Sequence, residues 1–240
     1  MNAFKGKIAL VTGGGQGLGQ EICRSLAKEG ALVIVADVNK QKAEKAAKWI
    51  KYQRGKAQAI ELDVSDELSV KKVFDELDKQ FGVLDILINN AGIDFTKSLD
   101  EILTDEWQKV LKVNLIGAFL MTKHAFSVMG KKEPGQVINI CSTASKRAWA
   151  NASAYHASKW GLLGFSHAAH VEGREKNIKV TALVSGGMKT PFILERFPEA
   201  EPNLQDPKNV AEVIKFVLSL PKETAIPEVM VIPMRETSWP

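Results

Sequence analysis

Three side chains near the middle of the sequence could together move a proton. Tyr155 and Lys159 lie four residues apart in Tyr-His-Ala-Ser-Lys, and Ser142 precedes the tyrosine by 13 residues. Residues i and i+4 project from the same face of a helix, so the ammonium group would lie near the phenol. A nearby positive charge lowers the pKa of tyrosine, which is ordinarily near 10. Such a phenol could exchange a proton with an alcohol or a carbonyl while Ser142 hydrogen-bonds the same oxygen.

A glycine-rich turn far upstream could hold a dinucleotide. Residues 12–19 read Thr-Gly-Gly-Gly-Gln-Gly-Leu-Gly, between a predicted buried strand and a predicted helix. Gly13 can adopt a positive φ, Gly17 lets the backbone approach a pyrophosphate, and Gly19 lets the helix pack closely on the strand. The helix N-terminus then offers N–H groups to the phosphates. The spacing differs from the commoner G-x-G-x-x-G, so the strand and helix on either side carry the prediction. With the proton-moving group, this turn predicts hydride transfer involving a nicotinamide.

An acidic residue favours NAD over NADP. Asp37 ends the second predicted strand, 18 residues past Gly19, where a carboxylate can accept both ribose hydroxyls and would repel a 2′-phosphate. Neither Arg nor Lys occurs between Gly13 and Gly19. The alternative for Asp37 is an N-cap of the next helix, although Asn39 could fill that position. Lys40 is the residue that could soften the preference.

Two further strand ends complete the predicted cofactor side. Asp63 and Val64 follow the third strand and suit an adenine edge and face, but Asp63 is equally suited to capping its own loop. The fourth strand is followed by Asn-Asn-Ala-Gly at residues 89–92. The asparagines could tie neighbouring loops together, while the small residues leave room for the cofactor.

Short apolar runs alternate with helical patterns along the chain, which predicts a doubly wound α/β fold. The runs are apolar on both faces, as strands of a parallel sheet covered by helices require. Polar or glycine residues follow each strand, so we expect one cleft along the carboxyl edge of the sheet and one domain over residues 1–240. We expect strands at 8–12, 32–36, 57–62, 84–88, 136–140 and 178–184, and helices at 16–29, 41–53, 67–81, about 105–129 and 154–172.

The segment 188–206 interrupts this alternation with prolines and aromatic residues. Its length and apolar content favour a substrate loop or lid, and the alternative is a helical hairpin packed permanently on the body. Residues 226–233 follow it and predict a seventh strand at the sheet edge, where proline is tolerated.

Composition excludes several classes of function. The 240 residues are 45% hydrophobic and 25% charged, which is typical of globular proteins, and the net charge of +4 does not indicate a nucleic-acid partner. The basic run 40–56 has the spacing of a solvated helix face, with a phosphate-binding patch as the alternative. No apolar run reaches 18 residues, and the N-terminus lacks the apolar stretch of a signal peptide. Cys23 and Cys141 lack CxxC partners, so we expect a reduced compartment, the cytoplasm. His167 and His170 are too few ligands for a metal, and none is expected.

These motifs resemble those of the short-chain dehydrogenase/reductase family in its single-domain branch, in order and spacing, over about residues 5 to 190. The resemblance implies a seven-stranded, mostly parallel Rossmann-type sheet and a tetrad of Asn114, Ser142, Tyr155 and Lys159, with Tyr155 as the acid/base. It also implies that Lys159 binds the nicotinamide ribose and Thr190 the carboxamide. Asn114, in an otherwise apolar helix, needs a partner and could hold a water that relays protons from Lys159. The expected cofactor-binding set is Gly13, Gln16, Gly17, Leu18, Gly19, Asp37, Asp63, Val64, Asn90, Ala91, Gly92, Tyr155, Lys159, Gly187 and Thr190.

Two departures from the family pattern carry expectations of their own. Where the family usually has Pro-Gly after the sixth strand, this sequence has Ser185-Gly186. Because proline restricts the backbone, we expect its loss to weaken cofactor binding or loosen the loop. The tail at 226–233 replaces the glycine-rich ending common in fatty-acid-type reductases, which disfavours acyl-carrier substrates.

The leading hypothesis is an oxidoreductase that transfers a hydride between NAD(H) and a secondary alcohol, ketone or hydroxy acid. A non-catalytic NAD(H) sensor or scaffold on the same fold is the alternative, although a sensor needs no proton donor. An epimerase or dehydratase would need a sugar-nucleotide lobe, for which this chain lacks room. The helices at 105–129 and 154–172 carry apolar residues on more than one side, which predicts a homodimer or homotetramer.

Overall fold

The apolar runs of the sequence form the strands of one parallel sheet. The computed structural model describes residues 3–131 and 133–236. Within them the strand order is β3-β2-β1-β4-β5-β6-β7, and every neighbouring pair is parallel, which confirms the doubly wound, seven-stranded Rossmann-type sheet. The strands are β1 (Ile8–Thr12), β2 (Leu32–Asp37), β3 (Lys56–Glu61), β4 (Ile86–Asn89), β5 (Gly135–Ser142), β6 (Ile178–Ser185) and β7 (Glu228–Val231).

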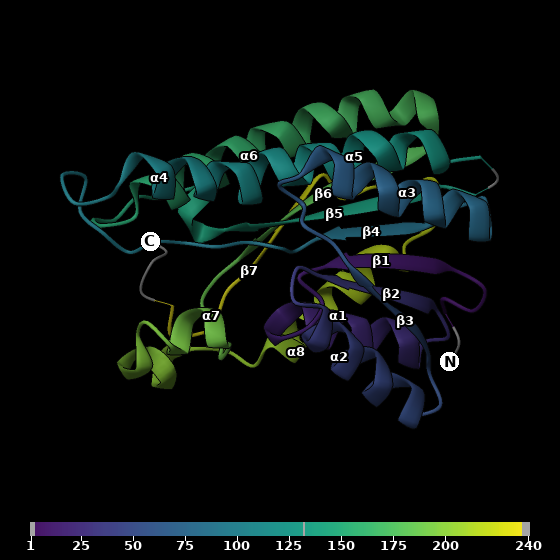
Figure 1. Ribbon diagram of the computed structural model, residues 1–240, viewed down its shortest axis with the longest axis horizontal. Helices are drawn as coiled ribbons and strands as arrows, with labels where there is room; N and C mark the ends of the chain where they lie inside the picture. The colour runs from purple at the N-terminus through teal and green to yellow at the C-terminus, as the bar shows by residue number, and fades with distance from the viewer. Residues whose placement is uncertain (1–2, 132, 237–240) are drawn as a thin grey trace.

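Helices cover both faces of this sheet (Figure 1). One layer contains α1 (Gly17–Lys28), α2 (Lys40–Tyr52) and α8 (Pro207–Leu218). The other contains α3 (Glu67–Phe81), α4 (Thr104–Leu111), α5 (Gly117–Val128) and α6 (Ser153–Gly173). The helix α8 was not predicted, because the prolines of the preceding segment suggested a continuing loop. Its start is nevertheless encoded, since Asp206 caps it through a 2.8 Å bond from the Lys208 N–H and Pro207 takes the first helical position.

The core explains why the strands are apolar on both faces. Along β1, Ala9 and Val11 pack in the cluster under α1, α2 and α8, whereas Ile8 and Leu10 pack in the cluster under α3, α5 and α6. Alternate side chains of a strand point to opposite faces, so a strand between two helical layers buries every position. This burial fixes the register, because a slip of one residue would exchange the two clusters.

The predicted helix at 105–129 is continuous but not uniform. Between α4 and α5 lies a π-helical turn, η1 (Lys112–Ile116), which places one extra residue in the helix. Asn114, inside this turn, is buried at 1% exposure. Extra residues of this kind often occur at functional sites, because they redirect a side chain without ending the helix.

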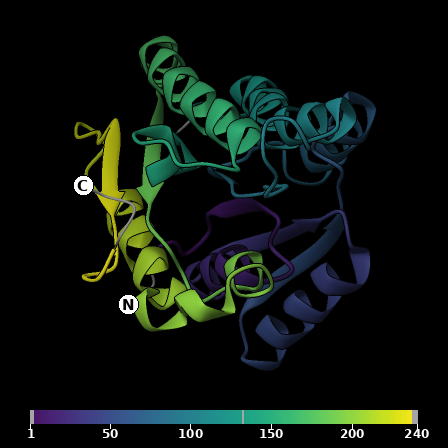
Figure 2. The ribbon, with the colours of Figure 1, turned by 90° about the vertical axis from the view of Figure 1, so that its left-hand side faces the viewer.

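The segment 188–206 lies at the carboxyl edge of the sheet, which faces the viewer in Figure 2. It contains a short helix, α7 (Pro191–Leu194), and a 3₁₀ turn at Pro198–Asn203. Its ends are held together, since the Lys189 N–H donates to the Gln205 carbonyl at 2.9 Å and Met188 bridges to Gln205. The segment is therefore a loop whose two ends are hydrogen-bonded together. Its two helical turns are shorter than the helices of the helical hairpin that was the alternative.

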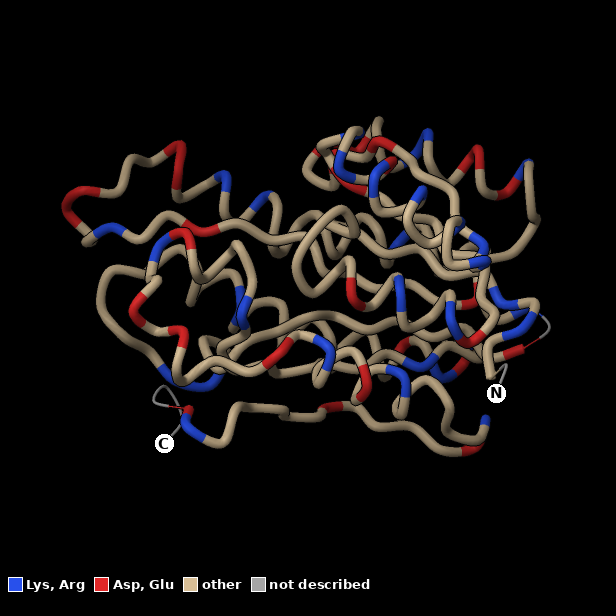
Figure 3. The backbone as a smooth tube through the Cα atoms, turned by 90° about the horizontal axis from the view of Figure 1, so that it is seen from below, with Lys and Arg blue, Asp and Glu red and all other residues tan. Residues whose placement is uncertain are grey.

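Acidic and basic residues are interspersed along the backbone when the molecule is seen from below (Figure 3). All five lysines of α2, which lies on this side of the sheet, are exposed, as expected for a solvated face: Lys40, Lys42, Lys45, Lys48 and Lys51. Over the part of the chain that the structure describes, no helix has the length and apolarity needed to cross a membrane.

Candidate active site

A cavity of about 850 Å³ lies at the carboxyl ends of the strands, where the neighbouring strands β1 and β4 are followed by helices on opposite faces of the sheet. Most of the residues predicted from the sequence line it. They are Gly13, Gln16, Gly17, Leu18, Asp37, Asp63, Val64, Asn90, Ala91, Gly92, Ser142, Tyr155, Lys159, Gly187 and Thr190. Gly19 and Asn114 do not line it, but each contacts a residue that does: Gly19 packs against Gly13, and Asn114 is hydrogen-bonded to Ile93. The fold therefore brings the two predicted groups, about 120 residues or more apart in sequence, to one cavity.

The glycine turn has the backbone that a phosphate-binding loop requires. Gly13 and Gly17 have φ values of +62° and +53°, the left-handed region that favours glycine. A Cβ on Gly19 would collide with the carbonyl oxygen of Gly13, so only glycine fits where α1 meets β1. Asn90 holds this turn from the neighbouring strand, since its Nδ2 donates to the carbonyls of Thr12 at 2.9 Å and Gly13 at 3.2 Å. The expected tie between the two loops is confirmed.

Asp37 is held at the tip of β2 with both carboxylate oxygens engaged by the backbone. Its Oδ2 accepts from the Gly15 N–H at 3.0 Å, and its Oδ1 accepts from the Asn39 N–H at 2.9 Å. Asn39, not Asp37, caps α2, because its Oδ1 accepts the Lys42 N–H at 3.0 Å. The backbone thus fixes the carboxylate at the cavity wall, and Asp37 is 8% exposed. Each carboxylate oxygen keeps a lone pair that can accept a hydrogen bond from a ligand.

Lys42 is a cation at the same end of the cavity that the sequence reasoning missed. Its Nζ donates to the side-chain oxygen of Gln16 at 2.6 Å, and both residues line the cavity. Lys40, the residue expected to soften the preference for NAD, does not line it. The position of Lys42 in α2 could have indicated this placement. Lys42 is the third residue after the N-cap Asn39, and a side chain on the first turn of a helix faces the loop that precedes the helix.

Asp63 caps its own loop, as one of its two predicted roles required. Its Oδ1 accepts from both the N–H, at 2.9 Å, and the hydroxyl, at 2.6 Å, of Ser65. Asp63 also lines the cavity beside Val64, which is 6% exposed. The capping bonds use one carboxylate oxygen, so they do not prevent the other from facing a ligand.

The predicted proton-moving group comes together at the N-terminal part of α6 and the end of β5. Lys159 is 5% exposed, and its Nζ donates to the Ile140 carbonyl at 2.7 Å and lies 5.6 Å from the centre of the Tyr155 ring. The side chains of Ser142 and Tyr155 are hydrogen-bonded to each other. Ser142 also accepts the Ala144 N–H at 3.1 Å, which orients its hydroxyl at the strand end.

The pKa of Tyr155 is shifted opposite to the expected direction. Enclosure in the cavity raises it from 10.0 to about 12, because burial disfavours the phenolate. The hydrogen bond with Ser142 and the charge of Arg196 lower this pKa, whereas the charge of Asp94 raises it. Burial also lowers the pKa of Lys159. The net shift is therefore upward and not downward as expected, because desolvation outweighs the hydrogen bond and the charges that act on the phenol.

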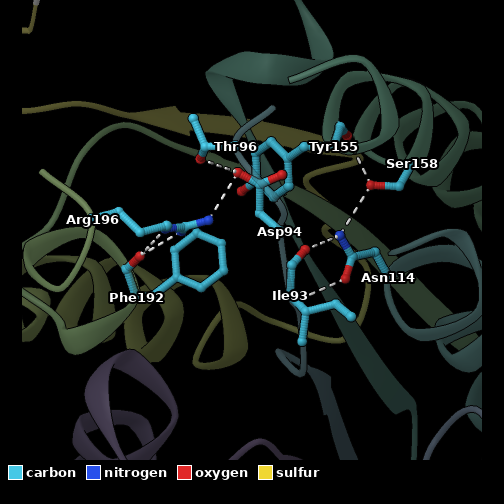
Figure 4. Close-up of polar contacts among 8 residues, drawn as sticks. All are labelled: Ile93, Asp94, Thr96, Asn114, Tyr155, Ser158, Phe192 and Arg196. Atoms are coloured by element: carbon cyan, nitrogen blue, oxygen red, sulfur yellow. Dashed lines mark hydrogen bonds and ion pairs between the residues drawn. The ribbon is translucent and has the colours of Figure 1, made fainter. Parts of the chain in front are cut away.

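Asn114 connects the loop after β4 to α6. Its Oδ1 accepts from the Ile93 N–H at 2.8 Å, and its Nδ2 donates to the Ile93 carbonyl at 2.9 Å and to the Ser158 hydroxyl at 3.1 Å. Ser158 in turn donates to the Tyr155 carbonyl at 2.8 Å (Figure 4). Both amide hydrogens are therefore engaged, and one lone pair of Oδ1 remains for a water. The proton relay through such a water stays a prediction.

A family model described as short chain dehydrogenase matches residues 7–201 of this chain. The chain belongs to the short-chain dehydrogenase/reductase family. It is 37% identical over 213 residues to YxjF, an uncharacterized oxidoreductase of Bacillus subtilis, covering 88% of this chain and 83% of that protein. It is 33% identical to a cyclohexanol dehydrogenase of an Acinetobacter species, covering 91% and 90%. A crystal structure of a metagenomic short-chain oxidoreductase in complex with NADP aligns with a TM-score of 0.86 and 27% identity over 97% of this chain and 99% of that one.

As a short-chain dehydrogenase/reductase, the protein is an oxidoreductase of a family that binds a nicotinamide cofactor. The residues present fit such a group on structural grounds. The glycine turn leaves a cradle that a Cβ at Gly13 or Gly17 would strain, and α1 begins at this turn with its N–H groups toward the cavity. Asp37 supplies hydroxyl acceptors at the expected strand tip.

Ser185 replaces the family proline at the end of β6. Its hydroxyl donates to the Cys141 carbonyl at 3.2 Å, and its backbone is paired with Ser142 of β5 and Val231 of β7. The next loop is held too, because the Gly187 N–H donates to Glu236 at 2.9 Å. These bonds substitute for some of the stiffness that proline would supply, so the predicted loosening stays a prediction.

An ion pair of the cavity was also not identified from the sequence. Asp94 follows the loop that Asn114 holds, and Arg196 follows α7. Their side chains meet at 2.8 Å next to Tyr155 in Figure 4. They lie 102 residues apart in sequence. Local patterns carry no signal for such a pair, because only the fold brings the two segments together.

His156 fixes the loop that follows Ser142. Its Nε2 accepts the Trp149 N–H at 3.1 Å, so Nδ1 carries the proton and donates to the Ala144 carbonyl at 3.0 Å. The rings of Trp149 and His156 also meet edge to face at 4.4 Å. Trp149 lines the cavity.

Other residues considered for chemistry have structural partners instead. Glu228 of β7 accepts from Lys146 at 2.8 Å and contacts His167 at 3.1 Å. His170 bonds the Val180 carbonyl through Nδ1 at 3.0 Å. Lys146 is thereby held at the edge of the sheet, away from the cavity lining.

Proposed function

We propose that this protein is an NAD-dependent alcohol dehydrogenase or carbonyl reductase. Its substrates would be secondary alcohols, ketones or hydroxy acids. One observation carries the proposal: Ser142, Tyr155 and Lys159 line the same cavity as the glycine turn and Asp37. A dinucleotide that spans this cavity would bring its reactive ring to the phenol, which is the arrangement hydride transfer needs.

The proposed chemistry assigns one task to each side chain. Tyr155 takes the hydroxyl proton of an alcohol, or donates its own proton to a carbonyl oxygen. Ser142 hydrogen-bonds that same oxygen and stabilises the charge that develops on it. A bound nicotinamide would supply the hydride acceptor for alcohol oxidation and the hydride donor for carbonyl reduction. Lys159 would bind the nicotinamide ribose, and Asn114 holds the loop and the helix that frame the phenol.

The raised pKa of Tyr155 supports reduction as the faster direction near neutral pH. A phenol with a pKa of about 12 is almost fully protonated there and ready to act as an acid. Oxidation of an alcohol needs the phenolate, whose fraction increases about tenfold per pH unit below that pKa. The positive charge of the oxidised cofactor would lower the pKa and assist this second direction.

For the cofactor we propose NAD, with Asp37 as the deciding residue. A carboxylate fixed by two backbone N–H groups cannot turn away from a 2′-phosphate, and the repulsion is strong at the cavity wall. Lys42 opposes this preference, but its Nζ is engaged by Gln16. The preference between NAD and NADP therefore depends on the balance between the fixed carboxylate of Asp37 and the ammonium group of Lys42.

We also propose a homodimer or homotetramer that acts in the cytoplasm as a single domain, with the segment 188–206 as its lid. Exposed apolar side chains support the assembly: Ile116 and Phe119 near the start of α5, and Trp160 and Val171 on α6, are between 43% and 59% exposed. Such a surface commonly packs against another subunit. A monomeric mass by light scattering would contradict the assembly. Both cysteines are buried free thiols, as suits a reducing compartment.

Replacement of Tyr155 by phenylalanine tests the enzymatic proposal directly. A panel of cyclic and linear alcohols, ketones, hydroxy acids and a β-keto thioester is assayed by NADH absorbance, with NADPH in parallel. We expect turnover by the wild type and a loss of at least a thousandfold in Tyr155→Phe, with NADH affinity within threefold. Cofactor binding without turnover of any panel member by the wild type would favour the sensor over the enzyme.

A further inference from the structure

An ion pair crosses the substrate end of the cavity. Nη1 of Arg196, just beyond α7, lies 2.8 Å from Oδ2 of Asp94, in the loop that follows β4. Both residues line the cavity with Tyr155, and in Figure 4 the pair lies beside the phenol ring. The pair therefore joins the proposed lid to the body of the protein at the place where a substrate would meet the proton donor.

The guanidinium of Arg196 is held by Phe192 as well as by Asp94. Its Nε donates to the Phe192 carbonyl at 2.9 Å, and its Nη2 donates to the same oxygen. The group also stacks over the Phe192 ring, 4.1 Å from its centre, and that ring lies 5.9 Å from the ring of Tyr155. A planar fork bound in this way holds its remaining N–H groups in set directions.

The carboxylate of Asp94 depends on this arginine. Its side chain is only 9% exposed, and Oδ2 accepts from Arg196 and, at 3.3 Å, from the Thr96 hydroxyl. Oδ1 is buried and has no hydrogen-bond partner among the described residues. A buried charge with one unsatisfied oxygen binds its counter-ion tightly, because separation would leave it unpaired. The arginine is thus committed to Asp94, and the pair has no net charge.

The rest of this end of the cavity is mostly apolar. Phe192, Ile193, Phe197 and Trp149 line it around the ion pair. Lys109 of α4 also lines the cavity and is exposed to solvent. A substrate carboxylate placed against Arg196 would meet the charge of Asp94 at close range, in surroundings that screen it poorly. A neutral substrate meets no such repulsion.

We propose that the Asp94–Arg196 pair selects neutral alcohols and ketones and excludes substrates with a carboxylate near the reacting carbon. This inference rests on the proposed function and narrows it, since it removes hydroxy acids from the substrate class. It also assigns the exclusion to Asp94, while Arg196 would bind a carboxylate if Asp94 were neutral.

The test compares acetoacetate with its methyl ester, which places the same ketone beside a charged or a neutral group. We expect the wild type to prefer the ester by at least tenfold in kcat/KM. Asp94→Asn keeps the shape of the side chain and should move this ratio at least tenfold toward the acid, because Arg196 is released. The gain should disappear in Asp94→Asn/Arg196→Met and persist in Asp94→Asn/Lys109→Gln, the matched control for loss of a cavity-lining cation.

A ratio within twofold of the wild type in Asp94→Asn would overturn the inference, as would a gain that survives the loss of Arg196. If Asp94→Asn does not fold, Arg196→Met tests the same pair, since the lone carboxylate should reject acetoacetate at least tenfold more strongly than in the wild type. Calorimetric binding of both ligands to the enzyme with NAD in its oxidised form gives the ratio without turnover. If the wild type turns over neither compound, the proposed function is contradicted. The binding ratio of the two ligands then still tests whether the Asp94–Arg196 pair excludes a carboxylate.

Discussion

The pKa of Tyr155 can be measured directly, because the chain has two tyrosines in contrasting surroundings. Tyr52 is 81% exposed, whereas Tyr155 lies in the cavity. Tyr52→Phe leaves Tyr155 as the single phenol that titrates, and alkaline titration by ultraviolet absorbance then follows its phenolate alone. We expect a midpoint of about 12 in the free protein. Tyr155→Phe is the matched control, because it removes the phenol in the cavity and keeps the exposed Tyr52.

The same shift sets a cost in stability. A difference of about two pKa units corresponds to about 3 kcal/mol between the protonation states. Because the folded-state pKa lies above the unfolded one, the full stability is present below about pH 10 and falls as the pH increases toward 12. Urea unfolding of the wild type should therefore lose up to about 3 kcal/mol more across this window than that of Tyr155→Phe.

Binding of the oxidised cofactor supplies the second half of this experiment. Its positive ring should lower the midpoint of Tyr155, and the rate of alcohol oxidation should increase about tenfold per pH unit below the new value. A midpoint at or below 10 in the free Tyr52→Phe protein would refute the reasoning that burial outweighs the neighbouring charges. A midpoint of 12 that the cofactor leaves unchanged would instead refute the assisted oxidation.

Substitutions at four further positions test other parts of the site. Asp37→Ser should reduce the preference for NADH over NADPH at least tenfold in fluorescence titrations, and Lys42→Ala should increase it; an unchanged ratio in both would remove the charge argument. Asn114→Ala should lower the unfolding free energy by about 1–3 kcal/mol in urea titrations and reduce kcat, because Ile93 loses partners for its N–H and carbonyl. Ser185→Pro should tighten NAD binding in calorimetry, because proline restricts the backbone. Ser185→Ala is the control that removes only the hydrogen bond of the hydroxyl. Equal dissociation constants for Ser185→Pro and the wild type would contradict the hypothesis that the missing proline weakens cofactor binding.

The strands could be predicted from the sequence because burial on both faces leaves a strong local signal. Each apolar run became a strand, with boundaries displaced by one or two residues, as at Ile86–Asn89 instead of 84–88. The helix Pro207–Leu218 was missed although Asp206 and Pro207 mark its start, since prolines nearby were interpreted as loop. The π turn around Asn114 leaves no trace in an apolar pattern, because one extra residue hardly changes the periodicity.

The site divides in the same way between local and long-range causes. The glycine turn, Asp37 and the helical pair of Tyr155 and Lys159 depend on short spacings, so the sequence located them. The pair of Asp94 and Arg196 depends on two loops meeting across the cavity, and no spacing predicts it.

The wrong pKa direction for Tyr155 has a related physical origin. Spacing on a helix correctly placed an ammonium near the phenol, but its Nζ is directed to the Ile140 carbonyl and lies 5.6 Å from the ring centre. Whether a neighbouring charge or desolvation prevails depends on how the whole cavity encloses the group, which is a property of the fold. The desolvation that raises the pKa also strengthens the effect of a nearby charge on the phenol, including that of an oxidised cofactor. Without a nearby cation, Tyr155 therefore has little phenolate with which to accept a proton. A bound oxidised cofactor would increase the phenolate fraction, so cofactor binding would control when Tyr155 can take the proton.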